Sequence, residues 1–144
     1  MTIRDGGAAD FAELGRIQAA SPGAATWPVE SYGVVLSHER RSLWIAEVEG
    51  RTAGFLVFDQ LPGEDAEILN LAVAPALRRR RVGAELVERL QSQTGAKVFL
   101  EVRASNAAAQ AFYEQLGFRK TGERKAYYHR PVENAWTYVW DLKG

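Results

Sequence analysis

The chain of 144 residues contains no cysteine. Disulfide bonds, thiolate nucleophiles and cysteine-based zinc sites are therefore all excluded, and the composition suits a reducing compartment. Net charge is also lacking, because 18 basic and 18 acidic residues cancel. No overall field favours nucleic acid or a membrane surface as partner, so any argument from charge must be local.

Long apolar runs are missing as well. No stretch approaches the ~20 consecutive apolar residues of a membrane-spanning helix. The opening "MTIRDGGAAD" does not place an apolar segment after a cationic one, as a targeting signal would. We therefore expect a cytoplasmic protein without a membrane partner. The length fits one domain, residues 1–144, that can bury a sizeable core.

The spacing of apolar residues predicts a strand, two helices, three strands, a helix, a strand, a helix and two strands. This order is typical of an α/β domain with a mixed, largely antiparallel sheet. The expected strands are 2–4, 42–50, 52–61, 66–74, 97–102, 118–128 and 135–142, and the expected helices 11–20, 27–39, 83–93 and 106–116.

Several residues predict where these elements begin or end. Asp10 is an expected N-cap, and Pro28 suits the first position of the second helix, where its missing N–H costs nothing. A tight turn at residues 49–50 would join the second and third strands. Pro75 cannot extend a central ladder, and Gly117 suits a helix C-terminus.

Four consecutive arginines, Arg78 to Arg81, stand where a strand turns into the helix that opens at Gly83. Unpaired N–H groups and the helix dipole favour an anion at such a turn, and a phosphorylated ligand is the natural occupant. Without further context, a solvated charge run or a weak nucleic-acid patch is the favoured interpretation of four arginines.

Three segments, "EILNLAVAP", "RRRRVGAELV" and "LEVRASNAAAQAFYEQLGF", together resemble the GNAT superfamily of acyl-CoA-dependent N-acetyltransferases. Within it, the pattern is most similar to the bacterial enzymes that acetylate the N-terminal alanine of a ribosomal protein. The resemblance implies one GNAT domain, with central strands that splay apart to receive the pantetheine arm of acetyl-CoA. It covers nearly the whole chain and is strongest over residues 67–118.

The resemblance also implies which residues hold acetyl-CoA. The backbone of the first segment would pair with the pantetheine arm, and N–H groups of the turn would hold the pyrophosphate. Arg81 departs from the family pattern, which has glycine there and so lets a phosphate approach the backbone closely. The expected cofactor-binding residues are Leu71, Ala72, Val73, Arg78, Arg79, Arg80, Arg81, Val82, Gly83, Ala84 and Asn106.

Acetyl transfer to an amine requires a proton acceptor, a contact for the oxygen that gains charge, and a proton for the departing thiolate. By resemblance, Glu101 would accept the ammonium proton, the N–H of Val73 would contact the oxygen, and Tyr113 would protonate the thiolate. A phenol with a pKa near ~10 can serve a thiol near ~8.5. Taken singly, Glu101 could be a strand-face charge, Tyr113 a packing residue and Asn106 an ordinary N-cap.

The acceptor implied by the resemblance is a protein or peptide N-terminus, with ribosomal proteins as acceptors in the most similar branch. Trp27, Tyr127 and Tyr128 would line its groove, although packing explains such aromatic residues almost as well. Acetylation of a small amine or a lysine, and acyl-CoA binding without turnover, remain alternatives. His38 and His129 are not spaced to form a metal site, so we expect no metal. Because the chain has no net charge, we also expect no nucleic-acid partner.

Overall fold

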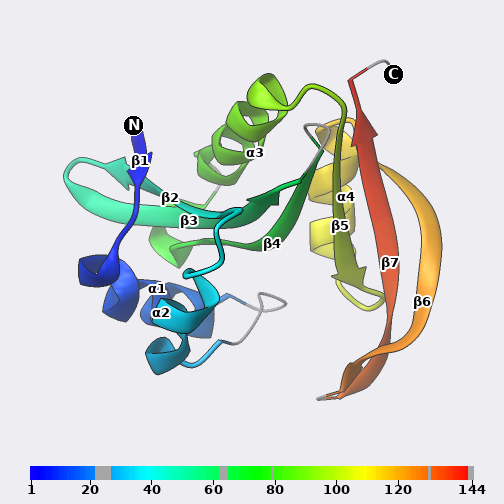
Figure 1. Ribbon diagram of the computed structural model, residues 1–144, viewed down its shortest axis with the longest axis horizontal. Coiled ribbons are helices and arrows are strands. Elements are labelled where there is room, and N and C mark those ends of the chain that lie inside the picture. Colours follow the sequence, from blue (N-terminus) through cyan, green and yellow to red (C-terminus); the bar gives the residue numbers. More distant parts are fainter. Residues whose placement is uncertain (22–26, 62–64, 79, 130, 143–144) are drawn as a thin grey trace.

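The computed structural model describes residues 1–21, 27–61, 65–78, 80–129 and 131–142 (Figure 1). Most of the turn expected at 62–65, and Arg79, lie outside these ranges. The strands are β1 (Thr2–Asp5), β2 (Arg41–Val48), β3 (Arg51–Gln60), β4 (Ala66–Val73), β5 (Lys97–Arg103), β6 (Arg119–His129) and β7 (Val132–Asp141). The α-helices are α1 (Phe11–Ala19), α2 (Tyr32–Val35), α3 (Val82–Gln93) and α4 (Ala107–Gln115), and short 3-10 turns are η1 (Ala8–Asp10), η2 (Val29–Ser31) and η4 (Pro75–Leu77).

The strands form a seven-stranded sheet in the order β1-β2-β3-β4-β5-β7-β6. Only β4 and β5 run parallel, and they are paired solely at Ala66–Val98 and Glu67–Phe99. Beyond this short contact the two strands diverge, which divides the sheet into a first arm (β1 to β4) and a second arm (β5 to β7), as Figure 1 shows. The expected mixed, largely antiparallel sheet with splayed central strands is confirmed.

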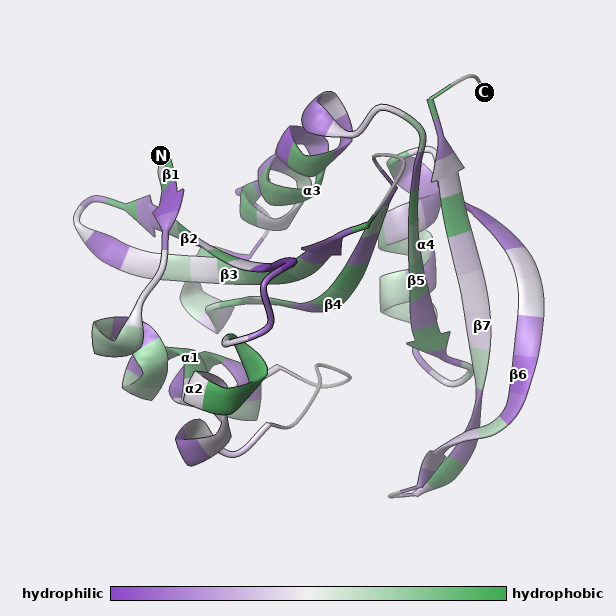
Figure 2. Cartoon of the chain, viewed as in Figure 1, coloured by the Kyte–Doolittle hydropathy of each residue, from purple (hydrophilic) through white to green (hydrophobic). Residues whose placement is uncertain are grey.

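Helices α1, α2 and α3 cover the first arm on both of its faces. Leu14, Ile17 and Tyr32 from α1 and α2 pack against one face, and α3 packs against the other through its own apolar side. Strands β2 and β3 are consequently buried on both faces, with unbroken runs of buried residues, as expected for strands between two helical layers. By contrast, β6 is exposed along nearly its whole length and carries much hydrophilic colour in Figure 2.

Strand β4 behaves differently from its neighbours. Its residues alternate strictly between buried and half-buried. The buried residues do not share one face, because Ala66 and Ile68 pack in the core beside α3 and Ala72 packs in the core beside α1. Leu69 has no partner on β3, because the register shifts between Val57↔Asn70 and Phe58↔Ile68. A bulge of this kind bends a strand and redirects its side chains. The bend lies just before the segment 71–73, which the sequence assigns to the cofactor.

Local signals explain most element boundaries. Glu49 and Gly50 both have positive φ, the geometry of the two-residue turns that best match the twist of a hairpin. Strand β4 ends at Val73, before Pro75, as expected. Asn106 caps α4 by accepting a hydrogen bond from the N–H of Ala109 at 3.1 Å, and Gly117 follows the helix with a φ of 92°.

Asp10 occupies the N-cap position of α1 as expected, but its side chain makes no cap hydrogen bond to that helix. A 3-10 turn, η1, precedes the helix, so Asp10 already has helical backbone angles. Its carboxylate instead accepts from the N–H of Gly7 at 2.9 Å and pairs with Arg4 at 2.8 Å. Its side chain therefore caps the 3-10 turn rather than the helix that follows.

The second helix is shorter than expected. A 3-10 turn, η2, leads into α2, which ends at Val35 rather than near residue 39. Gly33 and two β-branched valines make this turn a weak helix former, and the Ser37 hydroxyl donates to the carbonyl of Val34 at 2.6 Å just beyond it.

The loop expected at 129–134 is also shorter. Strand β6 continues to His129, and β7 already begins at Val132. Two register shifts in β6, one of them between Arg124 and Tyr128, let the strand stay paired along its length.

No helix within the described part of the chain combines the length and apolar character that a membrane crossing requires.

The close approach of β3 and β4 gives a test of the fold. A Cβ atom at Gly54 would lie 2.8 Å from the carbonyl oxygen of Ala72 and 3.3 Å from Cα of Val73. Overpacking of this kind costs ~1–3 kcal/mol, so Gly54→Ala should lower the free energy of unfolding by about that amount in urea titrations. Gly122→Ala, whose Cβ would meet no atom within 4 Å, is the matched control. Equal effects of both variants would contradict the close approach.

Candidate active site

A cleft of about 1200 Å³ opens where β4 and β5 diverge. Its walls come from both strands, from the N-terminal turn of α3 and from one side of α4, with Trp27, Tyr127 and Tyr128 at its edges. The cleft therefore gathers residues from segments about 100 positions apart in the chain. Of the residues singled out from the sequence, only Arg80 does not border it, and Arg79 lies outside the described residues.

The backbone of β4 offers hydrogen-bonding groups to the cleft. The N–H of Ala74 donates to Ala53 on β3 at 2.7 Å, and main-chain groups of successive strand residues point to opposite sides. Leu71 and Val73 therefore direct theirs away from β3, toward β5. Strand β5 pairs with β4 only at Ala66 and Glu67, so no strand reaches these two residues on that side. The Val73 carbonyl accepts from Arg78, and an extended ligand can supply partners for the other main-chain groups.

The turn before α3 combines donors with a strained residue. Arg81 precedes the helix with a φ of 60° and a ψ of 19°, in the left-handed region. The N–H groups of Val82, Gly83 and Ala84, in the first turn, have no acceptor within the helix, because the first such bond runs from Glu85 to the carbonyl of Arg81. All three residues border the cleft, so this helix N-terminus can accept an anion.

The arginine side chains of this turn do not act as one cluster. Arg78 donates to the carbonyls of Ala20 at 2.9 Å and Val73 at 3.3 Å, which ties the end of α1 to the end of β4. Arg81 folds along α3 and pairs with Glu88 at 2.6 Å. The backbone of the turn is thus better placed than its guanidinium groups to face a ligand.

Gly83 has a packing role that sequence reasoning missed. A Cβ there would lie 3.3 Å from the Phe112 ring and 3.5 Å from Val73. The absence of a side chain lets α3 begin close to both α4 and β4. The available signal was a glycine in the first turn of an expected helix, two positions after the last arginine.

Glu101 lies on β5 and faces the cleft with a side chain only 9% exposed. Its Oε1 lies 3.6 Å from Nε of Arg124 on β6. Its Oε2 is buried and accepts no hydrogen bond from any described residue. A buried carboxylate oxygen without a donor is costly, and a cationic donor that enters the cleft would satisfy it.

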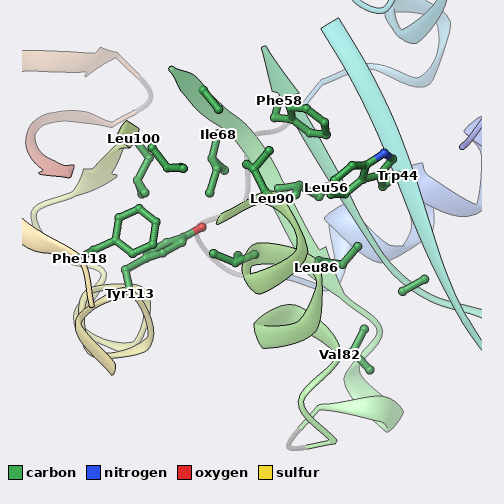
Figure 3. Close-up of a cluster of buried hydrophobic side chains, with 14 of the residues drawn as sticks. Trp44, Leu56, Phe58, Ile68, Val82, Leu86, Leu90, Leu100, Tyr113 and Phe118 are labelled. Atoms are coloured by element: carbon green, nitrogen blue, oxygen red, sulfur yellow. The ribbon is translucent and has the colours of Figure 1, made fainter. Parts of the chain in front are cut away.

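Tyr113 projects from α4 into the core and borders the same cleft. Its ring makes edge contacts with Phe112 and Phe118, with centroids 4.9 and 5.3 Å apart. Figure 3 shows the ring beside Phe118, with the hydroxyl directed toward the side of the cluster formed by α3. Burial, and next the charge of Tyr128, raises the pKa of the Tyr113 phenol, so the group keeps its proton at neutral pH.

Glu67 is a second carboxylate of the cleft, and sequence reasoning missed it. It pairs in register with Phe99, and Phe99 and Glu101 are two positions apart on β5, so all three share one face of the sheet. Burial, and next the charge of Glu101, raises the pKa of the Glu67 carboxyl, while Arg124 lowers it. The signal in the sequence was a glutamate within an expected central strand.

The three aromatic candidates border the cleft from opposite arms. Gln18, buried in α1, donates to the Trp27 carbonyl and accepts from the Tyr32 hydroxyl at 2.6 Å. Arg103 stacks over the ring of Tyr128, 4.1 Å from its centroid, and burial raises the pKa of that phenol to about 12. The cleft edges are thus held by specific contacts, and the buried amide of Gln18 was not recognised from the sequence.

No cluster of three or more potential metal-ligating side chains occurs among the described residues.

Comparison with known proteins identifies the family. The model of the acetyltransferase (GNAT) family matches residues 11–118. The chain belongs to this family. Within it, the chain is 41% identical over 83 residues to the [ribosomal protein bS18]-alanine N-acetyltransferase of Escherichia coli K12, covering 55% of each sequence. It is 31% identical over 115 residues to N-alpha-acetyltransferase RimI of Mycobacterium tuberculosis, covering 77% of this chain and 73% of that protein.

Solved GNAT structures agree with this assignment. The crystal structure of the ribosomal-protein-S18-alanine N-acetyltransferase from Escherichia coli superposes with a TM-score of 0.82 at 28% identity, covering 98% of this chain and 93% of the other. The resemblance inferred from the sequence is therefore confirmed at the level of family and fold.

Arg81 provides a test of the turn that opens α3. A left-handed backbone costs a non-glycine residue ~1–2 kcal/mol, so Arg81→Gly should raise the free energy of unfolding by about 1 kcal/mol in denaturant titrations. Glycine also lets a phosphate approach the backbone, so acetyl-CoA should bind equally well or more tightly.

Arg80→Gly is the matched control, because Arg80 is exposed and lacks a positive φ. It should lose stability through the greater flexibility of glycine in the unfolded chain. A Glu88→Gln variant measures how much the Arg81–Glu88 ion pair contributes to the free energy of unfolding. A large loss of acetyl-CoA affinity in Arg81→Gly would show that the arginine has taken over part of the binding.

Proposed function

We propose that this protein transfers the acetyl group of acetyl-CoA to the N-terminal α-amino group of a protein. The observation that carries the proposal is the buried carboxylate of Glu101, which faces the cleft with one oxygen unsatisfied. A cationic amine is the ligand that such a group requires. The names of the relatives in Escherichia coli and Mycobacterium tuberculosis support an α-amino acceptor.

The residues of the cleft fit acetyl-CoA as co-substrate, which supplies an acetyl thioester. Backbone groups of Leu71 and Val73 would pair with its amide-containing arm, between the diverging strands. The N–H groups that open α3 would hold its pyrophosphate, aided by the helix dipole. Asn106 borders the cleft and would add a contact from its amide group, since its oxygen already caps α4.

The reaction requires two protons to leave the ammonium nitrogen of the acceptor and one to reach the thiolate. Glu101 takes a proton from the ammonium group, directly or through water. The neutral nitrogen then forms a bond to the acetyl carbon, and the N–H of Val73 stabilises the charge on the acetyl oxygen. As the carbon–sulfur bond breaks, the Tyr113 phenol gives its proton to sulfur. The nitrogen, now bonded to the acetyl carbon, releases its second proton through water, and the Tyr113 phenolate takes up a proton again. No acyl-enzyme is involved, which agrees with a chain without cysteine.

The α-amine is favoured over lysine on energetic grounds. The pKa of an α-amino group is ~7.7–8.0 and that of lysine ~10.4, so deprotonating lysine at neutral pH costs roughly 3 kcal/mol more. A carboxylate base suits the easier task. Trp27, Tyr127 and Tyr128 would border the entry of a flexible chain end with a small first residue such as alanine. A ribosomal protein in the cytoplasm is the acceptor we propose.

A peptide assay tests the acceptor. One alanine-initiated peptide carries a free N-terminus and an internal lysine, and a second is identical but blocked at its N-terminus. After incubation with acetyl-CoA, mass spectrometry should locate the acetyl group on the α-amine of the first peptide and find the second essentially unmodified. Equal acetylation of the blocked peptide would favour a lysine acceptor, and acetylation of neither, with acetyl-CoA bound, would favour a binding domain without turnover.

Variants of the two proton-transfer residues test the mechanism. Glu101→Gln and Tyr113→Phe should each lower kcat by about 10²- to 10⁴-fold, the usual contribution of a general base or acid, with little change in acetyl-CoA affinity. Glu114→Gln and Tyr138→Phe are matched controls, because this Glu–Tyr pair, hydrogen-bonded at 2.7 Å, does not border the cleft. If the first two variants keep full turnover at saturating substrates, the assigned roles are wrong.

A further inference from the structure

Arg124 is the charged neighbour of Glu101, and the mechanism above gives it no role. Its Nε lies 3.6 Å from Oε1 of Glu101, which is an ion pair but too long for a good hydrogen bond. The arginine side chain is 60% exposed, whereas that of Glu101 is 9% exposed. A largely exposed cation thus faces a buried anion.

The position of Arg124 follows from the fold of the β6–β7 hairpin. The register between these strands shifts just after Arg124, which is paired with Ala135. Ala126, within the shift, has a φ of 50°, and its N–H donates to Oδ1 of Asn134 at 2.8 Å. The bulge also brings the Tyr127 ring to 5.6 Å from the Arg124 guanidinium carbon. The arginine therefore lies beside Tyr127, which borders the cleft, although it does not line the cleft itself.

The neighbouring cation, Arg103, is already engaged elsewhere. It pairs with Glu133 at 3.3 Å and stacks on Tyr128. Among the described residues, Arg124 is the one that pairs with Glu101 within 4.0 Å. Its charge also acts on the carboxyl of Glu67, whose pKa it lowers against the larger, raising effect of burial. Arg124 therefore compensates both carboxylates of the cleft.

We infer that Arg124 is a displaceable counter-ion, which compensates the charge of Glu101 from the side of Oε1 until the acceptor's ammonium group binds at Oε2. The inference rests on the proposed function, because it assumes that the acceptor is a cationic amine. Before an acceptor binds, the guanidinium group stabilises a carboxylate that would otherwise be buried without a partner. When the ammonium group arrives, like charges repel and the arginine moves back into water.

The chemistry of arginine suits this role. A guanidinium group stays protonated at any physiological pH, so it can neither give its proton to Glu101 nor be acetylated in place of the acceptor. The pair is easily broken, because its geometry is loose and one partner is largely solvated. Arg124 then acts as a competitor of the acceptor and sets how strongly the cleft binds an amine.

This role has the opposite experimental signature from an ordinary binding or supporting role. If Arg124 competes with the ammonium group, its removal should lower KM for the peptide. If it binds the peptide, or merely supports Tyr127, its removal should raise KM. The sign of the change in KM therefore decides between the two roles.

The experiment uses the full chain and the alanine-initiated peptide with a free N-terminus. Arg124→Gln and Arg124→Met should each lower KM for the peptide about two- to fivefold, or about 0.4–1 kcal/mol at 1.4 kcal/mol per tenfold. kcat and KM for acetyl-CoA should stay unchanged. Arg124→Lys, which keeps the positive charge, should stay near wild type. Arg119→Gln, an exposed arginine of the same strand, is the control for a general loss of charge.

An unchanged or increased KM in both neutral variants would overturn the inference while the proposed function stands. So would an equal decrease in Arg119→Gln, because it would reflect only the general field of the strand. Absence of peptide acetylation by the wild-type protein would instead overturn the proposed function itself, and with it this inference. Denaturant titrations of each variant show whether a change in KM reflects misfolding.

Discussion

The short parallel contact between β4 and β5 is the constraint on which the rest of the structure depends. Two register pairs hold the arms of the sheet together, and beyond them the strands separate. Main-chain groups left without a ladder partner are unfavourable unless a ligand or water satisfies them. The divergence thus places a row of polar groups in an otherwise apolar cleft. The same divergence lets Glu101 on one strand and Val73 on the other approach a common space.

The order of elements could be predicted from sequence because its signals are local. Alternating residues mark β4 and β5, and two residues suffice for the turn at Glu49 and Gly50. The cap of α4 by Asn106 likewise needs only its own neighbours. The predicted ends of helices and strands were wrong where contacts with other segments determine them. Helix α2 ends earlier than expected, and the bulged strand β6 extends farther than its own composition indicates.

The residues of the candidate site likewise fall into two groups, those that the sequence indicated and those that it did not. Glu101 and Tyr113 were found because they lie in a continuous segment that resembles a family. Glu67, Arg124 and Gln18 were missed, because each depends on a pairing across the fold. Glu67 acts beside Glu101 only through the register of β4 and β5, and Arg124 reaches Glu101 only through a bulge in β6. Sequence spacing gives no measure of such distances, whereas the register of a sheet fixes them.

The features that cost stability are concentrated around the cleft. Arg81 has a left-handed backbone at the turn before α3, Ala126 has one beside Tyr127, and Glu101 keeps a buried oxygen without a donor among the described residues. Each would be unfavourable in a domain optimised only for stability. Under the proposed function, the Arg81 backbone lies where a phosphate approaches, and Ala126 lies beside a side chain that borders the entry of the acceptor. The carboxylate of Glu101 then stays charged until the acceptor binds. Because the two-sided cores of the first arm are well packed, the fold can tolerate these local costs where the chemistry needs them.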